Sequence, residues 1–236
     1  MRAAAAPTES PFLMSTALII GASRGIGHEL ARQYRADGWR VLATARDDAG
    51  IDKLAALGCE PFKLDVTDAA SVSSIEWKLD GEKLDIAFLN AGIYGPRTSG
   101  LEPPLAQDFD AVMHTNVLAA MQIVPQLAGA LSAGSKLAVI SSRMGSMGTR
   151  ASSSGWLYRA SKAALNSVLK DASIMLQPQG VVCVSFHPGW VRTDMGGQGA
   201  DISVEESVRG MRSALSAAGA ARSGAFLNYD GTPIAW

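Results

Sequence analysis

The stretch LIIGASRGIGHELA (residues 18–31) runs from an apolar segment through three glycines directly into a helical pattern. Gly21, Gly25 and Gly27 therefore fall where a strand ends and a helix begins. Because glycine lacks a Cβ, these glycines leave room for a ligand near the backbone, and the first N–H groups of a helix bind phosphate. A tight strand-to-helix connection without a ligand is the alternative interpretation. The stretch lacks the Gly-Lys-Ser/Thr sequence of an ATP-binding P-loop.

The rest of the chain alternates apolar segments of strand length with helical patterns, without repeats or a linker. Strands that are apolar on both faces and alternate with helices predict a parallel sheet covered by helices on both sides. We therefore predict one α/β domain, a Rossmann-type doubly wound parallel sheet of about seven strands in the order 3-2-1-4-5-6-7. Its crevice should lie at the carboxyl ends of the strands. The expected strands are 16–21, 40–45, 59–66, 84–92, 135–142, 180–189 and 224–229. The expected helices are 27–38, about 50–57, from the N-caps Thr67 and Asp68 to about 79, 103–131, 156–177 and 203–218.

The composition argues against several classes of partner. The 236 residues include 21 Lys and Arg against 22 Asp and Glu, which does not suit a nucleic-acid or polybasic membrane surface. No apolar run approaches the roughly 20 residues of a membrane span. Cys59 and Cys183, the two cysteines, are expected in the core of a protein from a reducing compartment, and no Cys/His spacing resembles a metal site. We expect a cytoplasmic protein without nucleic-acid, membrane or metal partners.

The N-terminal segment 1–13 differs from the rest of the chain. Its sequence, MRAAAAPTESPFL, lacks the apolar core of about 7–15 residues that a signal peptide needs. We expect residues 1–13 to form a disordered tail and residues 14–236 to form the single domain. The first strand begins just after Met14, so Met1 and Met14 are both candidate starts.

The glycine turn GASRGIG (residues 21–27) closely resembles that of the short-chain dehydrogenases/reductases. The resemblance continues in order through LDVTD (64–68), LNAG (89–92), TNV (115–117), ISS (140–142), YRASK (158–162) and HPGWVRTDM (187–195). It extends from about residue 16 to the end of the chain. The sequence looks most like the carbonyl-reductase-like branch that includes the bacterial C-factor proteins. This resemblance implies an oxidoreductase that transfers a hydride between NADP(H) and a carbonyl or secondary alcohol, with NADPH-dependent carbonyl reduction as the favoured direction.

The end of the second strand bears on the choice of cofactor. NAD enzymes usually have an acidic residue there, which accepts hydrogen bonds from the adenosine ribose. This chain has Ala45 followed by Arg46, and an arginine binds a 2′-phosphate through charge-assisted hydrogen bonds. Arg24 in the glycine turn is a second candidate cation. We favour NADP(H) over NAD(H), although a shifted strand end would offer Asp47 to a ribose, and both arginines as solvated surface residues are a further alternative.

The resemblance implies a larger set of cofactor contacts. They come from the glycine turn, from the segments after the third, fourth and sixth strands, and from the helix that follows the fifth. The implied residues are Gly21, Ser23, Arg24, Gly25, Ile26, Gly27, Arg46, Asp65, Val66, Asn90, Ala91, Gly92, Tyr158, Lys162, Pro188, Gly189, Val191 and Thr193. For Asp65 a helix cap is the alternative role, and for the Asn90 segment a turn.

Tyr158 and Lys162 are four residues apart on a predicted helix, so both side chains lie on the same face. A lysine ammonium and an oxidised nicotinamide both stabilise a phenolate and lower the pKa of a tyrosine. Such a tyrosine exchanges a proton with a carbonyl or alcohol oxygen. Ser142, or failing that Ser141, ends the fifth strand and is expected to donate a hydrogen bond to the substrate oxygen. Alternatively, Tyr158 only packs and Lys162 is solvated.

Asn116 falls within an apolar stripe of the predicted long helix. A buried amide needs hydrogen-bond partners. The resemblance implies that Asn116 holds a water that connects Lys162 to solvent; a locally satisfied amide is the alternative. Only GGQGADIS (196–203) separates Met195 from the next helix, so we expect an open pocket for a small or exposed carbonyl substrate.

Two other functions are considered. A cofactor-binding regulatory or signalling protein of the C-factor type, with secondary catalysis, is the main alternative. A nucleotide-sugar epimerase also uses a Tyr-Lys pair, but this chain is too short for the usual substrate domain. Relatives assemble through the helix that contains Tyr158 and the long helix before it, so we expect a homodimer or homotetramer.

Overall fold

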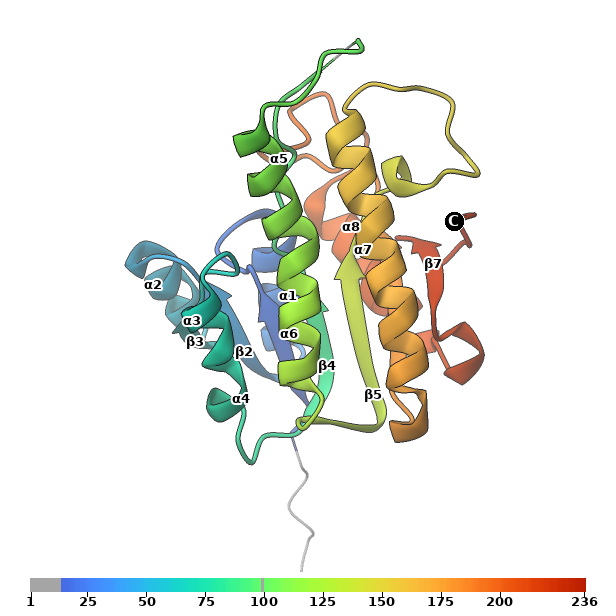
Figure 1. Cartoon of the computed structure of the whole chain (residues 1–236). Helices are drawn as coiled ribbons and strands as arrows, with labels where there is room; N and C mark the ends of the chain where they lie inside the picture. Colours follow the sequence, from blue (N-terminus) through green and yellow to red (C-terminus); the bar gives the residue numbers. More distant parts are fainter. Residues whose placement is uncertain (1–13, 99) are drawn as a thin grey trace, which may run out of the picture.

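The computed structural model describes residues 14–98 and 100–236, and the predicted tail at 1–13 lies outside these residues. In the described part of the chain, seven parallel strands form one sheet in the order β3-β2-β1-β4-β5-β6-β7, which confirms the predicted topology (Figure 1). The strands are β1 (Thr16–Ile20), β2 (Arg40–Ala45), β3 (Glu60–Lys63), β4 (Leu84–Leu89), β5 (Leu131–Ile140), β6 (Val182–His187) and β7 (Ala225–Asn228).

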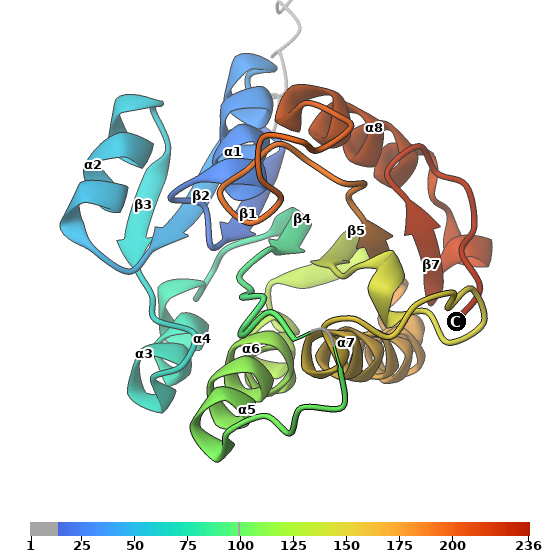
Figure 2. The same ribbon diagram turned by 90° about the horizontal axis from the view of Figure 1, so that it is seen from above.

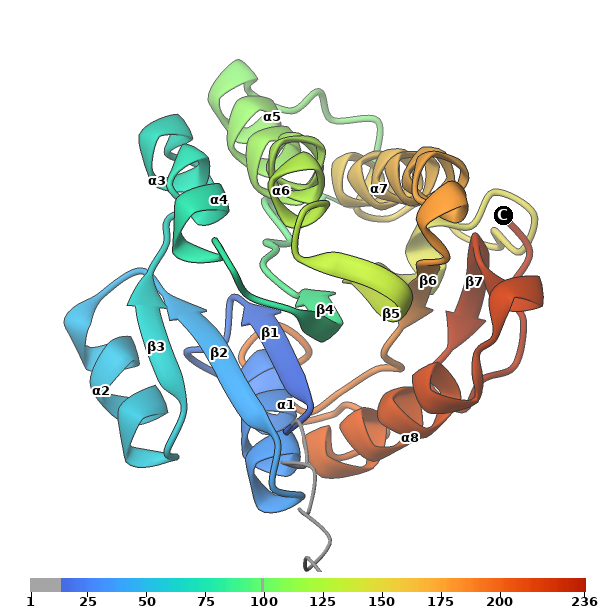
Figure 3. The same ribbon diagram turned by 90° about the horizontal axis from the view of Figure 1, so that it is seen from below.

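Helices cover both faces of the sheet. They are α1 (Gly25–Ala36), α2 (Asp48–Ala56), α3 (Ala69–Ser73), α4 (Ile75–Lys78), α5 (Ala106–Met113), α6 (Ala119–Leu127), α7 (Trp156–Met175) and α8 (Val204–Ala217). Short 3₁₀ helices span Arg143–Gly145, Gln177–Gln179 and Ala220–Arg222. Figures 2 and 3 show α1, α2 and α8 on one face, and α3, α4, α6 and α7 on the other. Among the described helices, none has the length and apolar character needed to cross a membrane.

Each central strand contributes alternate side chains to two apolar cores. In β1, Leu18 and Ile20 pack into the core beneath α6 and α7, whereas Ala17 and Ile19 pack into the core beneath α1 and α8. These four side chains are at most 1% exposed. Successive side chains of a strand point to opposite faces, so a sheet covered on both sides requires strands that are apolar throughout. The continuous apolar runs of the sequence have this physical origin.

The register of the strands places their carboxyl ends at one edge of the sheet. Ile20 pairs with Leu89, Leu89 with Val139, and Ile140 with Phe186. The segments that follow β1, β4, β5 and β6 therefore emerge side by side, as the view from above shows (Figure 2). The strand order reverses between β1 and β4, which is where ligands bind in sheets of this type.

The prediction of one long helix over 103–131 is wrong in detail. A π-helical segment, His114–Leu118, separates α5 from α6, and β5 already begins at Leu131. In this segment the N–H of Ala119 donates to the carbonyl of His114, five residues earlier. A π-helical turn adds one residue and often occurs at functional sites. The apolar stripe of the sequence cannot reveal it, because tertiary contacts fix the extra residue.

The helix predicted to run to about residue 79 is also divided, into α3 and α4. Asp68 caps α3, since its carboxylate accepts hydrogen bonds from the N–H groups of Ala70 and Ser71. Thr67, the other predicted cap, instead donates to Asp65 from its N–H and its hydroxyl. The local hydrogen bonds of Thr67 therefore belong to the turn before the helix.

Candidate active site

The glycine turn joins β1 to α1 through close backbone contacts. Gly21 has a φ of +83°, and a Cβ at Gly27 would lie 2.2 Å from the carbonyl oxygen of Gly21. These two glycines are therefore required by the turn itself. Arg24 is the N-cap residue of α1, and its side chain makes no capping hydrogen bond to the helix. The first turn of α1 contains no acidic residue. The start of α1 is thus also suited to bind the diphosphate of a dinucleotide.

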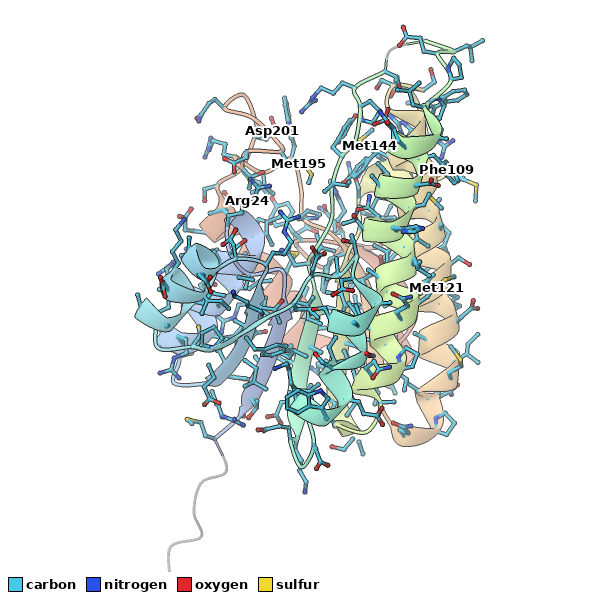
Figure 4. The ribbon with its side chains drawn as sticks, turned by 60° about the vertical axis from the view of Figure 1, so that its left-hand side comes forward. Arg24, Phe109, Met121, Met144, Met195 and Asp201 are labelled. Carbon is cyan, nitrogen blue, oxygen red and sulfur yellow. The ribbon has the colours of Figure 1, made fainter. Side chains whose placement is uncertain are left out.

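The loop after β6 lies against the glycine turn. Nη1 of Arg24 lies 3.0 Å from Oδ2 of Asp194, and both side chains of this ion pair are exposed. A Cβ at Gly25 would lie 3.4 Å from Cγ2 of Thr193. Figure 4 shows Arg24 and Met195 at the same end of the molecule. The sequence did not predict the pairing of Arg24 with Asp194, which competes with a 2′-phosphate for the same guanidinium.

Arg46 and Asp47, the two residues that leave the cofactor choice open, have different environments. Arg46 follows β2 directly and is exposed. Asp47 is the N-cap of α2, and its Oδ1 accepts a hydrogen bond from the N–H of Gly50 at 2.8 Å. The carboxylate of Asp47 is therefore engaged by its own helix. Arg46 comes directly after β2, at the strand end from which a ribose contact is expected in sheets of this type.

Asp65 lies at the turn after β3. Its Oδ1 accepts hydrogen bonds from the N–H and the hydroxyl of Thr67, at 2.9 and 2.7 Å. These hydrogen bonds hold the pKa of the Asp65 carboxyl below its usual range, and Arg46 lowers it further. The alternative role of Asp65 as a helix cap is wrong, because Asp68 is the cap.

The segment after β4 has no regular secondary structure, and it packs on the glycine turn. Nδ2 of Asn90 donates to the carbonyl of Gly21 at 2.6 Å, and the N–H of Ala91 donates to the carbonyl of Ile20 at 3.2 Å. Below it lies a cavity of about 10 Å³, enough for about one water molecule. Its lining includes three predicted residues, Val66, Ala91 and Asn116.

The remaining predicted contacts lie in the same region. Ile26 packs against the core beneath α1 from the glycine turn that also contains Ser23. After β6, the carbonyl of Pro188 accepts a hydrogen bond from the hydroxyl of Ser207 at 2.5 Å, Gly189 has a φ of +86°, and Val191 pairs with Ile202. In the described residues, no group of three or more His, Cys, Asp or Glu side chains is arranged to hold a metal ion.

The four predicted catalytic residues converge near the end of β5. Ser142 follows β5, and its hydroxyl accepts a hydrogen bond from the N–H of Met144 at 3.1 Å and lies near enough to Tyr158 on α7 to lower the pKa of its phenol. Nζ of Lys162 lies 5.7 Å from the centre of the Tyr158 ring. A Cβ on Gly92 would lie 3.3 Å from Nζ of Lys162 and 3.2 Å from Oδ1 of Asn116. All four side chains are at least nine-tenths buried. Ser141 points elsewhere, with its hydroxyl 3.4 Å from the carbonyl of Lys162.

Comparison with known proteins assigns the family. The family model of short chain dehydrogenases matches residues 15–201. The chain belongs to this family. A Burkholderia multivorans protein crystallised with bound NADP is 34% identical to this short-chain dehydrogenase, with a TM-score of 0.86 over 94% of this chain and 100% of the other. The NADPH-bound carbonyl reductase from chicken fatty liver is 34% identical, with a TM-score of 0.83 over 94% and 99%. The C-signal protein of Myxococcus xanthus is 35% identical over 155 residues, which cover 65% of this chain and 93% of that protein.

Burial dominates the ionisation of Tyr158 and Lys162 in this short-chain dehydrogenase. Burial raises the pKa of Tyr158 to about 12, and this effect outweighs the lowering by the neighbouring Ser142 hydroxyl. Burial also lowers the pKa of Lys162 to about 8. Without the nicotinamide, burial dominates the pKa of Tyr158, and the lowering by Lys162 together with an oxidised nicotinamide stays a prediction. At neutral pH Tyr158 is a phenol, the form that donates a proton.

Asn116 is buried within the π-helical segment, and its side chain is satisfied locally. Its Nδ2 donates to the carbonyl of Ile93 at 2.8 Å and to the hydroxyl of Ser161 at 2.9 Å. Its Oδ1 accepts from the N–H of Ile93 at 2.8 Å. The alternative interpretation of a locally satisfied amide therefore holds for the side chain. Asn116 fixes the segment after Gly92 against α7, and its role in a proton relay stays a prediction.

Sequence reasoning missed Tyr94. The rings of Tyr94 and Tyr158 stack, with centres 4.5 Å apart and planes inclined by 23°. Tyr94 lies two residues after the LNAG motif, and an aromatic residue there was the only available signal. It also missed Arg159, whose buried guanidinium donates to the carbonyl of Ser154 and the hydroxyl of Ser152. Arg159 thereby holds the loop between Ser142 and α7.

Proposed function

We propose that this chain is an NADP(H)-dependent oxidoreductase that interconverts a carbonyl and a secondary alcohol, acting mainly as an NADPH-dependent carbonyl reductase in the cytoplasm. The observation that carries the proposal is the convergence of Ser142, Tyr158 and Lys162 beside the glycine turn and Gly92. A proton donor, a hydrogen-bond donor and a cation next to a dinucleotide site are the groups that carbonyl reduction requires.

Each protein group has a defined task in carbonyl reduction. NADPH, when bound, supplies the hydride to the carbonyl carbon. The Tyr158 phenol donates its proton to the carbonyl oxygen, and the Ser142 hydroxyl donates a hydrogen bond to the same oxygen as negative charge develops. Lys162 is buried beside Tyr158, and its positive charge stabilises the phenolate left after proton transfer. In the oxidative direction the same groups act in reverse.

NADP(H) is preferred over NAD(H) on electrostatic grounds. The exposed guanidinium of Arg46 follows β2, whereas the carboxylate of Asp47 is engaged as a helix cap. An unengaged carboxylate near the ribose would favour NAD(H), and a guanidinium favours a 2′-phosphate. The two structural relatives crystallised with NADP or NADPH support this preference.

The alternative is a regulatory or signalling protein whose main role is to bind NADP(H) and whose catalysis is secondary, which the similarity to C-signal supports. The intact set of Ser142, Tyr158 and Lys162 argues for catalysis, since a protein that only binds the cofactor has no need of a proton donor. The cofactor site alone is common to both functions, so binding of NADPH does not distinguish them.

Transfer of a labelled hydride distinguishes the two functions. The protein is first titrated with NADPH and NADH by fluorescence and then incubated with deuterated NADPH and a panel of ketones, aldehydes and quinones. We expect tighter binding of NADPH and deuterium on the alcohol carbon of a product. Binding of NADPH without deuterium transfer to any member of the panel would contradict the proposed enzyme and favour the regulatory alternative.

We further propose that the protein forms a homodimer or homotetramer through α5, α6 and α7. Phe109 and Met121 lie on the outer surface of α5 and α6, and are 47% and 55% exposed (Figure 4). Ile174 and Met175 at the end of α7 are also exposed. Several exposed apolar side chains on neighbouring helices are typical of an interface. Light scattering at micromolar concentration should give the mass of a dimer or tetramer, and a monomer alone would contradict the assembly.

A further inference from the structure

The ring of Tyr94 covers one face of the Tyr158 ring. Tyr94 comes from the segment after β4 and Tyr158 from α7, and their ring centres are 4.5 Å apart. One face of the catalytic ring is therefore covered by the protein itself. A substrate at the Tyr158 hydroxyl therefore cannot lie over the ring face that Tyr94 covers.

Tyr94 is held in this position from the start of α7. A Cβ at Gly155 would lie 2.4 Å from the hydroxyl oxygen of Tyr94, so the ring occupies space that glycine alone leaves open. The N–H of Gly155 donates to the carbonyl of Thr98 at 3.0 Å. The segment that contains Tyr94 therefore contacts the start of α7 twice, through the Tyr94 ring and through the carbonyl of Thr98.

The far side of Tyr94 is occupied by a cation. The guanidinium carbon of Arg97 lies 4.9 Å from the centre of the Tyr94 ring. Because Tyr158 covers one face of that ring, the guanidinium lies over the other. Nη2 of Arg97 donates to the carbonyl of Met195 at 3.1 Å, which bridges the segment after β4 and the loop after β6. Figure 4 shows Met195 at the end of the molecule where Met144, beside Ser142, also lies.

The Tyr94 ring and the Met195 carbonyl hold the guanidinium of Arg97 in place, but neither of them carries a negative charge. Among residues 14–98 and 100–236, no carboxylate forms a salt bridge with it, whereas Arg24 at the same edge is paired with Asp194. A guanidinium has five N–H donors, and the Met195 carbonyl accepts from one nitrogen of the group. The donors on its outer edge match the two oxygens of a carboxylate.

We infer that Arg97, seated on Tyr94, binds a carboxylate of the substrate, so that the preferred substrates are oxo acids whose carboxylate extends past the Tyr94 ring. This inference rests on the proposed carbonyl reduction and names its substrate class. The carbonyl binds at Tyr158 and Ser142, the linking chain passes the edge of Tyr94, and the carboxylate pairs with Arg97. An exposed pair of this kind contributes to binding and selection rather than to the chemical step.

The test compares 5-oxohexanoate with its methyl ester, which has the same carbonyl and lacks the charge. Wild type should prefer the acid, and Arg97→Gln should lower the acid-to-ester ratio of kcat/KM about tenfold through a higher KM for the acid. Arg97→Lys, which keeps the charge but loses the planar fork, should fall between. Arg209→Gln on α8 removes the same charge from an exposed position elsewhere and should leave the ratio unchanged.

Two results would overturn the inference. One is an equal acid-to-ester ratio in wild type and Arg97→Gln; the other is a loss of NADPH affinity in Arg97→Gln, which would assign the guanidinium to the cofactor. Calorimetric binding of 5-oxohexanoate to the NADP-loaded protein does not depend on turnover. Equal binding by wild type and Arg97→Gln would refute the carboxylate site. Unequal binding without reduction of either compound would retain that site and refute oxo acids as the substrate class, whereas the deuterium-transfer panel tests the proposed reaction itself.

Discussion

Lys162 donates a hydrogen bond from Nζ to the carbonyl oxygen of Ile140 at 2.8 Å, at the last residue of β5. This bond ties the catalytic helix α7 to the strand that precedes Ser142. It also holds an ammonium group that is only 3% exposed. The position of the cation beside Tyr158 is therefore set by the sheet as well as by the four-residue spacing on the helix.

Burial of Lys162 makes the stability of the protein depend on pH. Its pKa falls from 10.5 in the unfolded chain to about 8 in the folded protein, so between these values the unfolded chain binds more protons. Stability therefore rises as pH increases through this window. Between about pH 7.5 and 9.5, the free energy of unfolding of wild type should increase by about 2 kcal/mol relative to Lys162→Met. Urea denaturation of both proteins measures it, and a constant difference would contradict the buried ammonium.

Arg46→Ala should weaken binding of NADPH at least tenfold and leave binding of NADH unchanged. The reason is that a 2′-phosphate loses a charge-assisted partner, whereas a ribose hydroxyl does not. Fluorescence titration with both cofactors gives the dissociation constants. Arg222→Ala is a matched control, because Arg222 is exposed just before β7, at the opposite edge of the sheet. Equal weakening of both cofactors would remove Arg46 from the 2′-phosphate site.

Asp47→Ala should lower the free energy of unfolding by about 1 kcal/mol, the usual cost of losing an N-cap. The lost interaction is the hydrogen bond from the N–H of Gly50 to Oδ1 of Asp47. The ratio of NADPH to NADH affinity should not change. Denaturation and cofactor titration of the same variant check both parts. A selective loss of NADH affinity would instead assign Asp47 to the ribose.

The sequence predicts the fold from local patterns, whereas most of the candidate site residues were named from the resemblance of the ordered motifs to a known family. Apolar runs such as β1 fix the two-sided sheet, and strand order brings the motifs after β1, β4, β5 and β6 to one edge. Tyr158 and Lys162 share a helical face by spacing alone. These features need no knowledge of distant contacts.

Features that depend on tertiary contacts could not be predicted in this way. The Tyr94 stack requires the space left at Gly155, which is 61 positions further along the chain. The π-helical segment contains Asn116, whose side-chain amide forms hydrogen bonds with the backbone N–H and carbonyl of Ile93. The pKa of Tyr158 is raised because burial outweighs its polar neighbours, and a spacing of residues contains no information on burial.

The central claim is that the Tyr158 hydroxyl donates the proton in a hydride-transfer reaction. Tyr158→Phe retains the ring that stacks on Tyr94 and removes only the proton donor. The most direct measurement is the rate of NADPH oxidation with a reducible carbonyl, alongside NADPH affinity, in wild type and in this variant. The account predicts unchanged affinity and a rate about 10²–10⁴-fold lower in the variant. A variant that binds NADPH and reduces the carbonyl at the wild-type rate would contradict it.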